Sequence, residues 1–224
     1  MPLADALAAV QAWYAARGLP PRVQTVEGSE LDAAIGELGF SVAELPAQRQ
    51  VAAVAAVLDH LTVREQVTPP HRPTGVLNHL TEQLPDDFLD LYRGGGRHPH
   101  APAVLTSGGA DITFAVARDP RDGTVLACGR LAHDRATGWA GLSAIAVAAR
   151  VRRRGFARSV LRDLVQRAAD VSAAHLYLEV DALNAEAVPL YAALGFEVGH
   201  TYHCRTPQSL PHPSAAVLTH VTTC

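Results

Sequence analysis

The sequence lacks lysine: all nineteen basic residues among its 224 are arginine, and alanine is abundant. This composition indicates a GC-rich bacterial coding background and says little about function. Cysteine is scarce too, since the chain has only Cys128, Cys204 and Cys224, with no CxxC pair. This odd number of separate cysteines predicts neither a disulfide framework nor a cysteine zinc site.

Long apolar runs and a surplus of positive charge are also missing. No apolar run approaches the roughly 18 to 20 residues that span a bilayer, and the first residues, MPLADALAAVQAWY, have no basic segment before an apolar one. We therefore expect a cytoplasmic protein with no membrane partner. The formal net charge is -3. Nucleic-acid-binding domains usually carry a broad basic face, so no nucleic-acid partner is expected.

Two histidine pairs raise the question of a metal site, namely His98 with His100 and His200 with His203. The first pair lies in a Gly/Pro-rich stretch, RGGGRHPHAP, that is typical of a loop. A zinc site needs three or four convergent ligands, which the sequence does not supply. We expect exposed loop histidines and no metal.

Residues 142–167 carry the strongest functional signal. The apolar segment LSAIAV runs into three arginines and Gly155 and then directly into an amphipathic helix. Gly155 lets the backbone approach a ligand, and the first turn of a helix leaves N–H groups without intrahelical partners. Five arginines within residues 150–158 oppose the helix dipole, which a bound anion would relieve. The stretch predicts a phosphate site, with a solvated helix start as the alternative.

The spacing of this stretch is neither GxxxxGK(S/T) nor GxGxxG. The pattern Val147-x-x-x-x-Arg152-x-x-Gly155-x-Ala157 resembles V-x-P-x-x-(R/Q)-x-x-G-x-(G/A), the coenzyme A pyrophosphate signature of the GNAT superfamily of acyl-CoA-dependent N-acyltransferases. Ala149 departs from it, because it stands where the family often has proline.

A second pair of segments extends the resemblance. HLYLEV (175–180) alternates as a strand does, and NAEAVPLYAALGF (184–196) reads as a short helix closed by Gly195. LEV, Asn184, Tyr191 and Gly195-Phe196 follow in the order and spacing of the second half of a GNAT domain.

The resemblance implies an α/β (α+β) GNAT fold, with a mixed antiparallel and parallel sheet, flanking helices and two strand-helix units that splay apart at the cofactor. The Asp119–Gly123 stretch has the chemistry of a hairpin turn. In the C-terminal part the expected helices are 85–93, 156–170 and 184–196, with a short element near 101–108, and the expected strands are 111–118, 123–133, 139–147, 175–180 and 196–205.

The same resemblance implies acetyl-CoA as co-substrate and no metal. The backbone of the Arg-Gly loop would hold the pyrophosphate, and the edge of the preceding strand would pair with the pantetheine amides. Asn184 would contact the pantetheine arm, or act as a plain helix cap, or both. The residues assigned to the cofactor are Ile145, Ala146, Val147, Arg152, Arg153, Arg154, Gly155, Phe156, Ala157, Arg158 and Asn184.

Two side chains are candidates for proton transfer. Tyr191 would protonate the departing thiolate, with a core tyrosine as the alternative. Glu179 matches a position used as general base in some relatives, although a strand glutamate without that duty is also common. A water chain or a histidine such as His133 would serve equally as base.

The first part of the chain repeats the second at a constant offset. Gly195-Phe196 lies 156 positions after Gly39-Phe40, and this offset aligns LADALAAVQAWYAARG, RVQTV and SELDAAIGELGF with the helix at 156–170, LYLEV and the helix at 184–196. Asn184, Tyr191 and Glu179 become Gly28, Ile35 and Val23. Chance similarity of two helix-strand-helix units is the alternative.

We therefore predict a degenerate half-GNAT module at 1–67, a linker at 68–75, a GNAT acyltransferase domain at 76–206 and a loosely ordered tail at 207–224. Between them, QVAAVAAVLDHLTV fits a buried strand or a helix equally.

The predicted function is transfer of an acetyl group from acetyl-CoA to a primary amine by direct attack. The acceptor would be a small molecule or a peptide, and a homodimer is compatible with the sequence. The alternative is a non-catalytic acyl-CoA-binding module with a regulatory or interaction role.

Overall fold

The computed structural model describes residues 1–67, 77–92, 99–108 and 110–208. The helices are α1 (Leu3–Ala15), α2 (Glu30–Glu37), α3 (Val54–Val67), α4 (Phe88–Leu91), α5 (Ala101–Thr106), the short 3-10 helix η2 (Ala149–Val151), α6 (Phe156–Asp170) and α7 (Ala187–Ala192). The strands are β1 (Val23–Val26), β2 (Phe40–Val42), β3 (Ala47–Ala53), β4 (Leu77–Thr81), β5 (Asp111–Arg118), β6 (Val125–Asp134), β7 (Trp139–Val147), β8 (His175–Asp181) and β9 (Glu197–Pro207).

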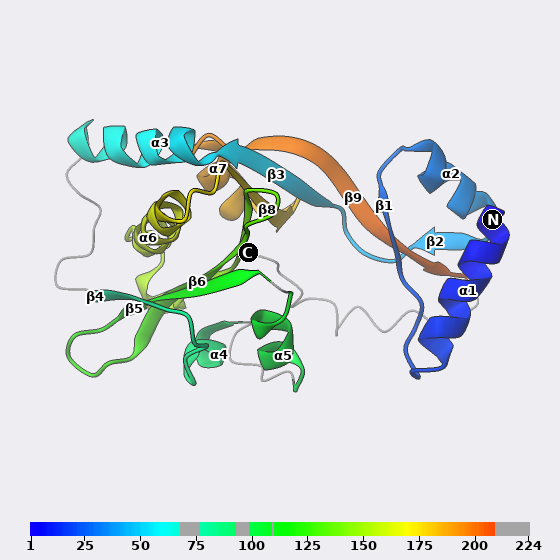
Figure 1. The fold of residues 1–224 in the computed structure, drawn as a ribbon, viewed down its shortest axis with the longest axis horizontal. Helices are drawn as coiled ribbons and strands as arrows, with labels where there is room; N and C mark the ends of the chain where they lie inside the picture. Colours follow the sequence, from blue (N-terminus) through cyan, green and yellow to red (C-terminus); the bar gives the residue numbers. More distant parts are fainter. Residues whose placement is uncertain (68–76, 93–98, 109, 209–224) are drawn as a thin grey trace.

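These nine strands form one sheet in the order β1-β9-β3-β8-β7-β6-β5-β4, and β2 also pairs with β9. β7 and β8 are parallel and the other pairs are antiparallel. Figure 1 shows two unequal lobes, a smaller one with α1, β1, α2 and β2 and a larger one with the remaining helices, while β9 runs through both. The predicted α+β fold with a mixed sheet is confirmed.

β3 and β9 are the strands that carry the chain between the two lobes. β3 lies between β8 and β9 of the larger lobe, and the C-terminal half of β9 lies between β1 and β2 of the smaller one. Arg49 of β3 opposes Glu179 of β8, and Arg205 of β9 opposes Val23 of β1. Glu179 and Arg205 lie 156 positions after Val23 and Arg49. The β3–β8 pair and the β9–β1 pair, here called the two crossings, therefore have the same register at the repeat offset.

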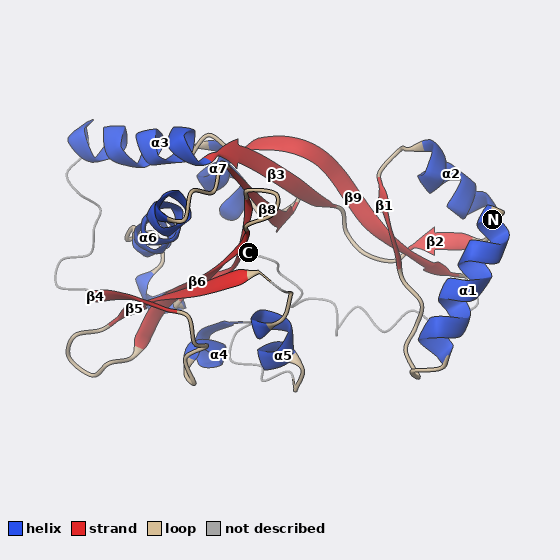
Figure 2. Ribbon diagram, in the orientation of Figure 1, coloured by secondary structure: helices blue, strands red, loops and turns tan. Residues whose placement is uncertain are grey.

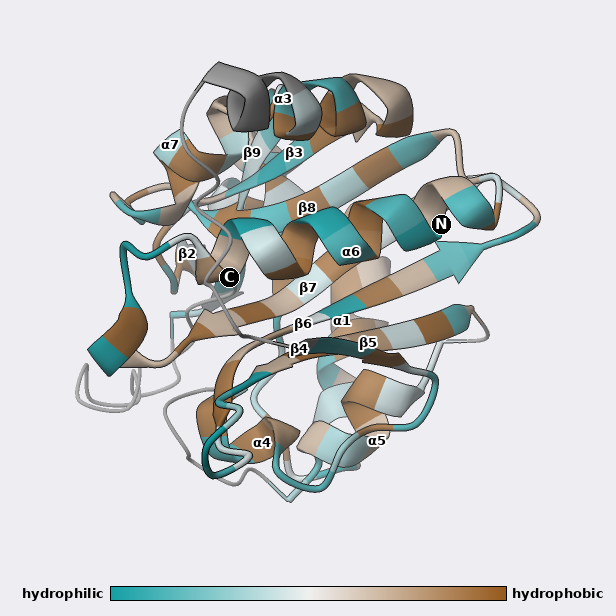
Figure 3. Ribbon diagram, turned by 90° about the vertical axis from the view of Figure 1, so that its left-hand side faces the viewer, coloured by the Kyte–Doolittle hydropathy of each residue, from teal (hydrophilic) through white to brown (hydrophobic). Residues whose placement is uncertain are grey.

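Helices cover both faces of the larger lobe (Figure 2). On one face, α3, α6 and α7 bury Val57, Leu164 and Tyr191 in a single core. On the other face, α4 and α5 bury Phe88 and Leu105 in a second core. Neighbouring residues of β5 and β6 enter opposite cores, as strand geometry requires. Figure 3 shows α6 lying in front of the middle strands.

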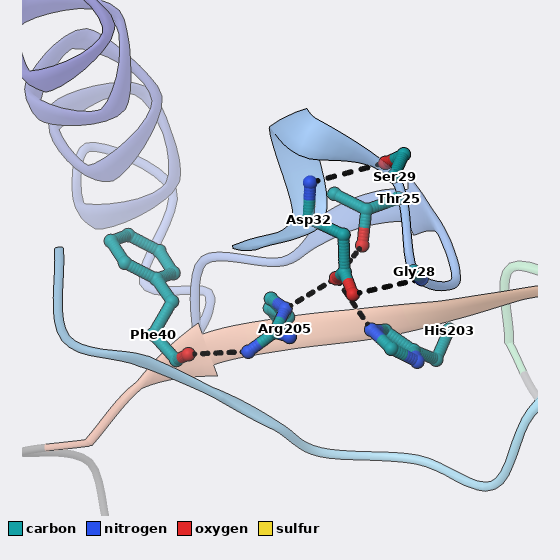
Figure 4. Close-up of polar contacts among 7 residues, drawn as sticks. All are labelled: Thr25, Gly28, Ser29, Asp32, Phe40, His203 and Arg205. Atoms are coloured by element: carbon teal, nitrogen blue, oxygen red, sulfur yellow. Dashed lines mark hydrogen bonds and ion pairs between the residues drawn. The ribbon is translucent and has the colours of Figure 1, made fainter. Parts of the chain in front are cut away.

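A buried carboxylate fastens β9 to the smaller lobe (Figure 4). Asp32 Oδ1 accepts hydrogen bonds from Thr25 Oγ1 at 2.7 Å and Arg205 Nε at 2.5 Å, and lies 2.7 Å from His203 Nε2. Oδ2 accepts from the Gly28 N–H at 3.3 Å. The hydrogen bond from Arg205 is the main reason that the pKa of Asp32 lies well below its usual range, since burial alone would raise it. The expectation of exposed loop histidines was wrong for His200 and His203, because both lie in β9 and His203 is buried in this cluster.

The structure gives the predicted helix at 156–170 and the predicted strands at 111–118 and 139–147 with the same bounds. For QVAAVAAVLDHLTV we expected a strand or a helix, and the segment contains one after the other, because β3 ends at Ala53 and α3 begins at Val54. The short strands β2 and β4 were not predicted, and the helix expected at 85–93 covers only Phe88–Leu91.

The predicted boundary between the two parts, 68–75, and residues 209–224 of the predicted tail lie outside the described residues. Residues 47–67 precede that boundary, yet β3 and α3 pack in the larger lobe. Within the described residues, no helix combines the length and apolarity that a membrane span requires.

Candidate functional site

The Arg-Gly loop connects β7 to α6. Gly155 is the N-cap of α6 with φ of +85°, a left-handed conformation that favours glycine, and no side chain caps the helix. Arg153 is also left-handed, with φ of +62°. Phe156 is buried and fixes the first turn of α6 to the core, while Ala157 is half-buried. The loop therefore presents a fixed, uncapped helix N-terminus, which suits an anion.

The arginine side chains of this loop point outwards. Arg152, Arg153 and Arg154 are exposed and Arg158 is half-buried. Arg152 Nη1 lies 3.8 Å from Glu186 Oε2, just before α7. The loop and the start of α7 are therefore neighbours, as the two sequence motifs predicted.

β7 and β8 separate beside this loop. They pair from Trp139 to Leu142 of β7 and from His175 to Leu178 of β8, and no pairing follows. On its other side β7 has a register shift against Cys128 and Arg130, and Ala144 at this bulge has φ of +55°. The edge of Ile145, Ala146 and Val147 that faces β8 thus has no strand partner among the described residues. Backbone groups at such an edge can pair with amides of a ligand.

Asn184 and Tyr191 lie before and within α7. Asn184 Oδ1 accepts hydrogen bonds from the N–H groups of Glu186 at 3.2 Å and Ala187 at 2.9 Å, so it caps the helix. Tyr191 is only 2% exposed, and its ring meets that of Phe196 edge-on at 5.9 Å. Asn184 is the predicted helix cap and Tyr191 has the predicted core position; neither finding tests the additional role in acyl transfer.

Glu179 lies on the face of β8 opposite to α6, because it alternates with the core residues Leu178 and Val180. Arg49 of β3 forms an ion pair with Glu179 Oε1, and Tyr202 of β9 donates to Oε2 at 2.7 Å. Burial and the bond to Glu179 raise the pKa of the Tyr202 phenol well above its usual value. Sequence reasoning missed both partners. The repeat offset could have indicated Arg49, because Arg205 is its equivalent.

His133 lies away from this region. A cavity of about 630 Å³ near the C-terminal end of α6 is lined by His133, Asp111, Arg135 and Arg167, among others. The loop at Gly155 is at the other end of α6. His133 therefore lies at the end of α6 remote from the loop, and its role as base stays a prediction. Within the described residues no group of three or more potential ligands could hold a metal ion.

Comparison with known proteins gave one family and many similar folds. Residues 78–196, more than half of the chain, match the model of the acetyltransferase (GNAT) family. The comparison with curated proteins found no match.

Solved structures share the fold at low sequence identity. A GCN5-related N-acetyltransferase from Kribbella flavida is 17% identical with a TM-score of 0.66, over 92% of this chain and 75% of that one. A tandem GNAT protein from the clavulanic acid biosynthesis pathway is 15% identical with a TM-score of 0.63, over 92% and 70%. A functionally unknown conserved protein from Staphylococcus epidermidis is 13% identical with a TM-score of 0.60, over 92% and 82%.

Proposed function

The chain belongs to the acetyltransferase (GNAT) family, and on this premise we propose that it transfers an acetyl group from acetyl-CoA to a primary amine. One observation carries the proposal: β7 and β8 separate where an arginine-rich loop opens onto the uncapped N-terminus of α6. The gap suits a long, narrow cofactor with an anionic end, because it joins unpaired strand amides to an anion site.

The cofactor roles follow the geometry. The N–H groups of the Arg153–Arg158 loop would bind the pyrophosphate, with the outward arginines adding positive charge. The free edge of Ile145, Ala146 and Val147 would pair with the pantetheine amides. Asn184 would contact the same arm beside the helix it caps.

The transfer itself needs a neutral amine and a proton for the departing thiolate. The amine attacks the thioester carbonyl, the carbon–sulfur bond breaks, and the Tyr191 phenol gives its proton to the thiolate. Glu179 would take a proton from the amine. Its carboxylate pairs with Arg49 and accepts from Tyr202, and a carboxylate with two partners retains acceptor sites for the amine N–H.

The test compares Gly155→Val with Gly123→Val. Both glycines have positive φ, +85° and +74°, so valine strains the backbone similarly, but Gly123 lies in the β5–β6 hairpin. Calorimetry should show acetyl-CoA binding to wild type and Gly123→Val, and none to a folded Gly155→Val. Thiol release with a panel of primary amines should follow the same order. Wild-type affinity in Gly155→Val would refute the site, and binding without transfer to any amine would favour the non-catalytic alternative.

A further inference from the structure

Arg130 of β6 is a half-buried cation beside the gap between β7 and β8. Its Nε donates to the Leu105 carbonyl at 2.7 Å, Nη1 to Ser143 Oγ at 3.3 Å and Nη2 to the Ser107 carbonyl at 3.4 Å. These bonds use three of the five N–H donors of a guanidinium. Two donors therefore have no partner among the described residues and can bind a ligand.

No carboxylate neutralises Arg130 within the described part of the chain. Arg49, Arg118, Arg135 and Arg205, in contrast, each pair with an aspartate or glutamate. Burial lowers the pKa of the Arg130 guanidinium, and the nearby groups that act against this are the phenols of Tyr177 and Tyr92. A partly desolvated cation without an anion is costly, so a bound anion would be stabilising here.

The position of Arg130 relates it to the reacting groups. Its partner Ser143 directly precedes the bulge residue Ala144, at the point where β7 and β8 stop pairing. Next along the same face of the sheet, the Tyr177 ring lies over Gly141, and Glu179 follows two residues later. Arg130 and Glu179 thus lie on the same face on opposite sides of the gap.

That face is the one from which an acceptor must come. A cofactor held at the N-terminus of α6 would enter the gap from the face that α6 covers, whereas Arg130 lies on the face that α5 covers. An amine attacking its thioester from the other face would pass between Arg130 and Glu179.

We infer that the acceptor is an amine that also carries a carboxylate, such as an amino acid, and that Arg130 binds this carboxylate. This inference rests on the proposed acetyl transfer. A carboxylate would take the two remaining donors of the guanidinium, while the amino group of the same molecule faces the thioester. The competing reading is that Arg130 only fastens α5 to the sheet through its two carbonyl partners.

The test uses two matched pairs of amines, phenylalanine with phenylalaninamide and alanine with alaninamide. Members of a pair differ in having a carboxylate or an uncharged amide. For each protein, kcat/KM for the carboxylate form is divided by that for the amide, and the ratio in wild type is compared with that in Arg130→Gln. Because the comparison is between proteins, differences in amine basicity cancel. The ratio should fall about ten- to hundredfold in Arg130→Gln, as expected for a charge-assisted hydrogen-bonded pair.

Two further variants separate recognition from anchoring. Arg118→Gln is the matched control, because Arg118 holds Asp87 beside α4 on the same face but has its own carboxylate. Its ratio should equal that of wild type. Arg130→Lys keeps the charge and should keep part of the preference. Arg130→Met, which removes the charge but keeps an unbranched stem, replaces Arg130→Gln if the latter fails to fold. A ratio that does not change on loss of the Arg130 charge overturns the inference.

If none of the four amines is acetylated, binding affinities replace kcat/KM in the comparison. Calorimetry of the CoA-loaded protein with N-acetylphenylalanine and N-acetylphenylalaninamide should give tighter binding of the carboxylate form in wild type only. Equal binding, or no binding of either, overturns the inference. Transfer to amines without discrimination would refute the carboxylate site alone, whereas absence of acetyl-CoA binding would refute the proposed function.

Discussion

In the larger lobe β8 pairs with β7 for four residues and then leaves it, whereas β1, its equivalent in the smaller lobe, has no neighbour on that side among the described strands. At the offset of 156, the paired residues His175–Leu178 correspond to residues 19–22, which include Pro20 and Pro21. Proline gives no N–H to a strand ladder. One plan of strand, helix and strand thus provides a gap between two strands in one lobe and a sheet edge in the other.

The ion pairs at the two crossings also differ, in how far they are exposed to solvent. The pair of Arg49 with Glu179 is partly open, with side chains 39% and 28% exposed, while the equivalent Arg205 reaches a carboxylate, Asp32, that is 8% exposed. The carboxylates come from different places, because Val23 occupies the position equivalent to Glu179. The Asp32 pair fastens β9 to the smaller lobe, whereas the Glu179 pair stays partly accessible to solvent.

Deletions at the boundary between the two lobes should have the largest effect on folding. Removing residues 1–67 takes away β3 from between β8 and β9, and with α3 the core residues Val54, Val57 and Leu61. Each such loss costs about 2 to 5 kcal/mol. We expect this form to aggregate, whereas removal of 1–43 keeps β3 and α3 and should retain a cooperative melt. Size-exclusion chromatography and circular dichroism test both truncated forms. A monomeric fragment 68–224 that melts cooperatively would show that the larger lobe does not need β3 and α3.

Tyr191 and Ile35 are equivalent and equally buried, at 2% and 1% exposure, but only the first carries a hydroxyl. Tyr191→Phe should lower the transfer rate about 10² to 10⁴-fold while acetyl-CoA affinity and melting temperature hold. Ile35→Val should do the reverse, costing about 1 kcal/mol of unfolding free energy with unchanged turnover per folded molecule. A Tyr191→Phe enzyme that loses stability but not rate would make the tyrosine a core residue only.

Asp32→Asn should lower the free energy of unfolding by about 3 kcal/mol, because it leaves the half-buried Arg205 without its counter-ion. Glu179→Gln should cost about 1 kcal/mol or less, since its pair is accessible to solvent. Urea titration of both variants measures the difference. Equal losses would remove the distinction drawn between the two crossings.

The same pair predicts a pH dependence. The pKa of Asp32 is lower in the folded protein than its unfolded value of about 3.9, so the ionised carboxylate contributes stability above that value. The contribution is lost as pH falls further towards the folded pKa. Unfolding free energy should therefore decline below about pH 4 in wild type, and more gently in Asp32→Asn.

The last prediction is that the smaller lobe contributes nothing to cofactor binding. Gly28 and Ile35 replace Asn184 and Tyr191 there, and Pro20 and Pro21 stand where β8 pairs with β7 in the larger lobe. Calorimetric titration should give one acetyl-CoA per chain. A reproducible stoichiometry of two would show that the smaller lobe has kept its own site.

Local signals in the sequence predicted much of the C-terminal part. Gly155 before an amphipathic run predicted where α6 begins, and Asn184 predicted a helix cap, because both depend on residues within a few positions. The helix expected at 184–196 covers only Ala187–Ala192. The repeat offset, which was read from residue identities, returns in the two strand registers.

Tertiary structure alone decided which strands meet. A strand can pair with any open edge, so the apolar pattern of 47–53 could not show that β3 inserts between β8 and β9. That insertion brings Arg49 to Glu179 across 130 positions of sequence, and the β5–β6–β7 sheet brings Arg130 beside α5 and the gap. Both arginines were inconspicuous in the sequence, because what sets them apart is the presence or absence of a carboxylate brought near by long-range pairing.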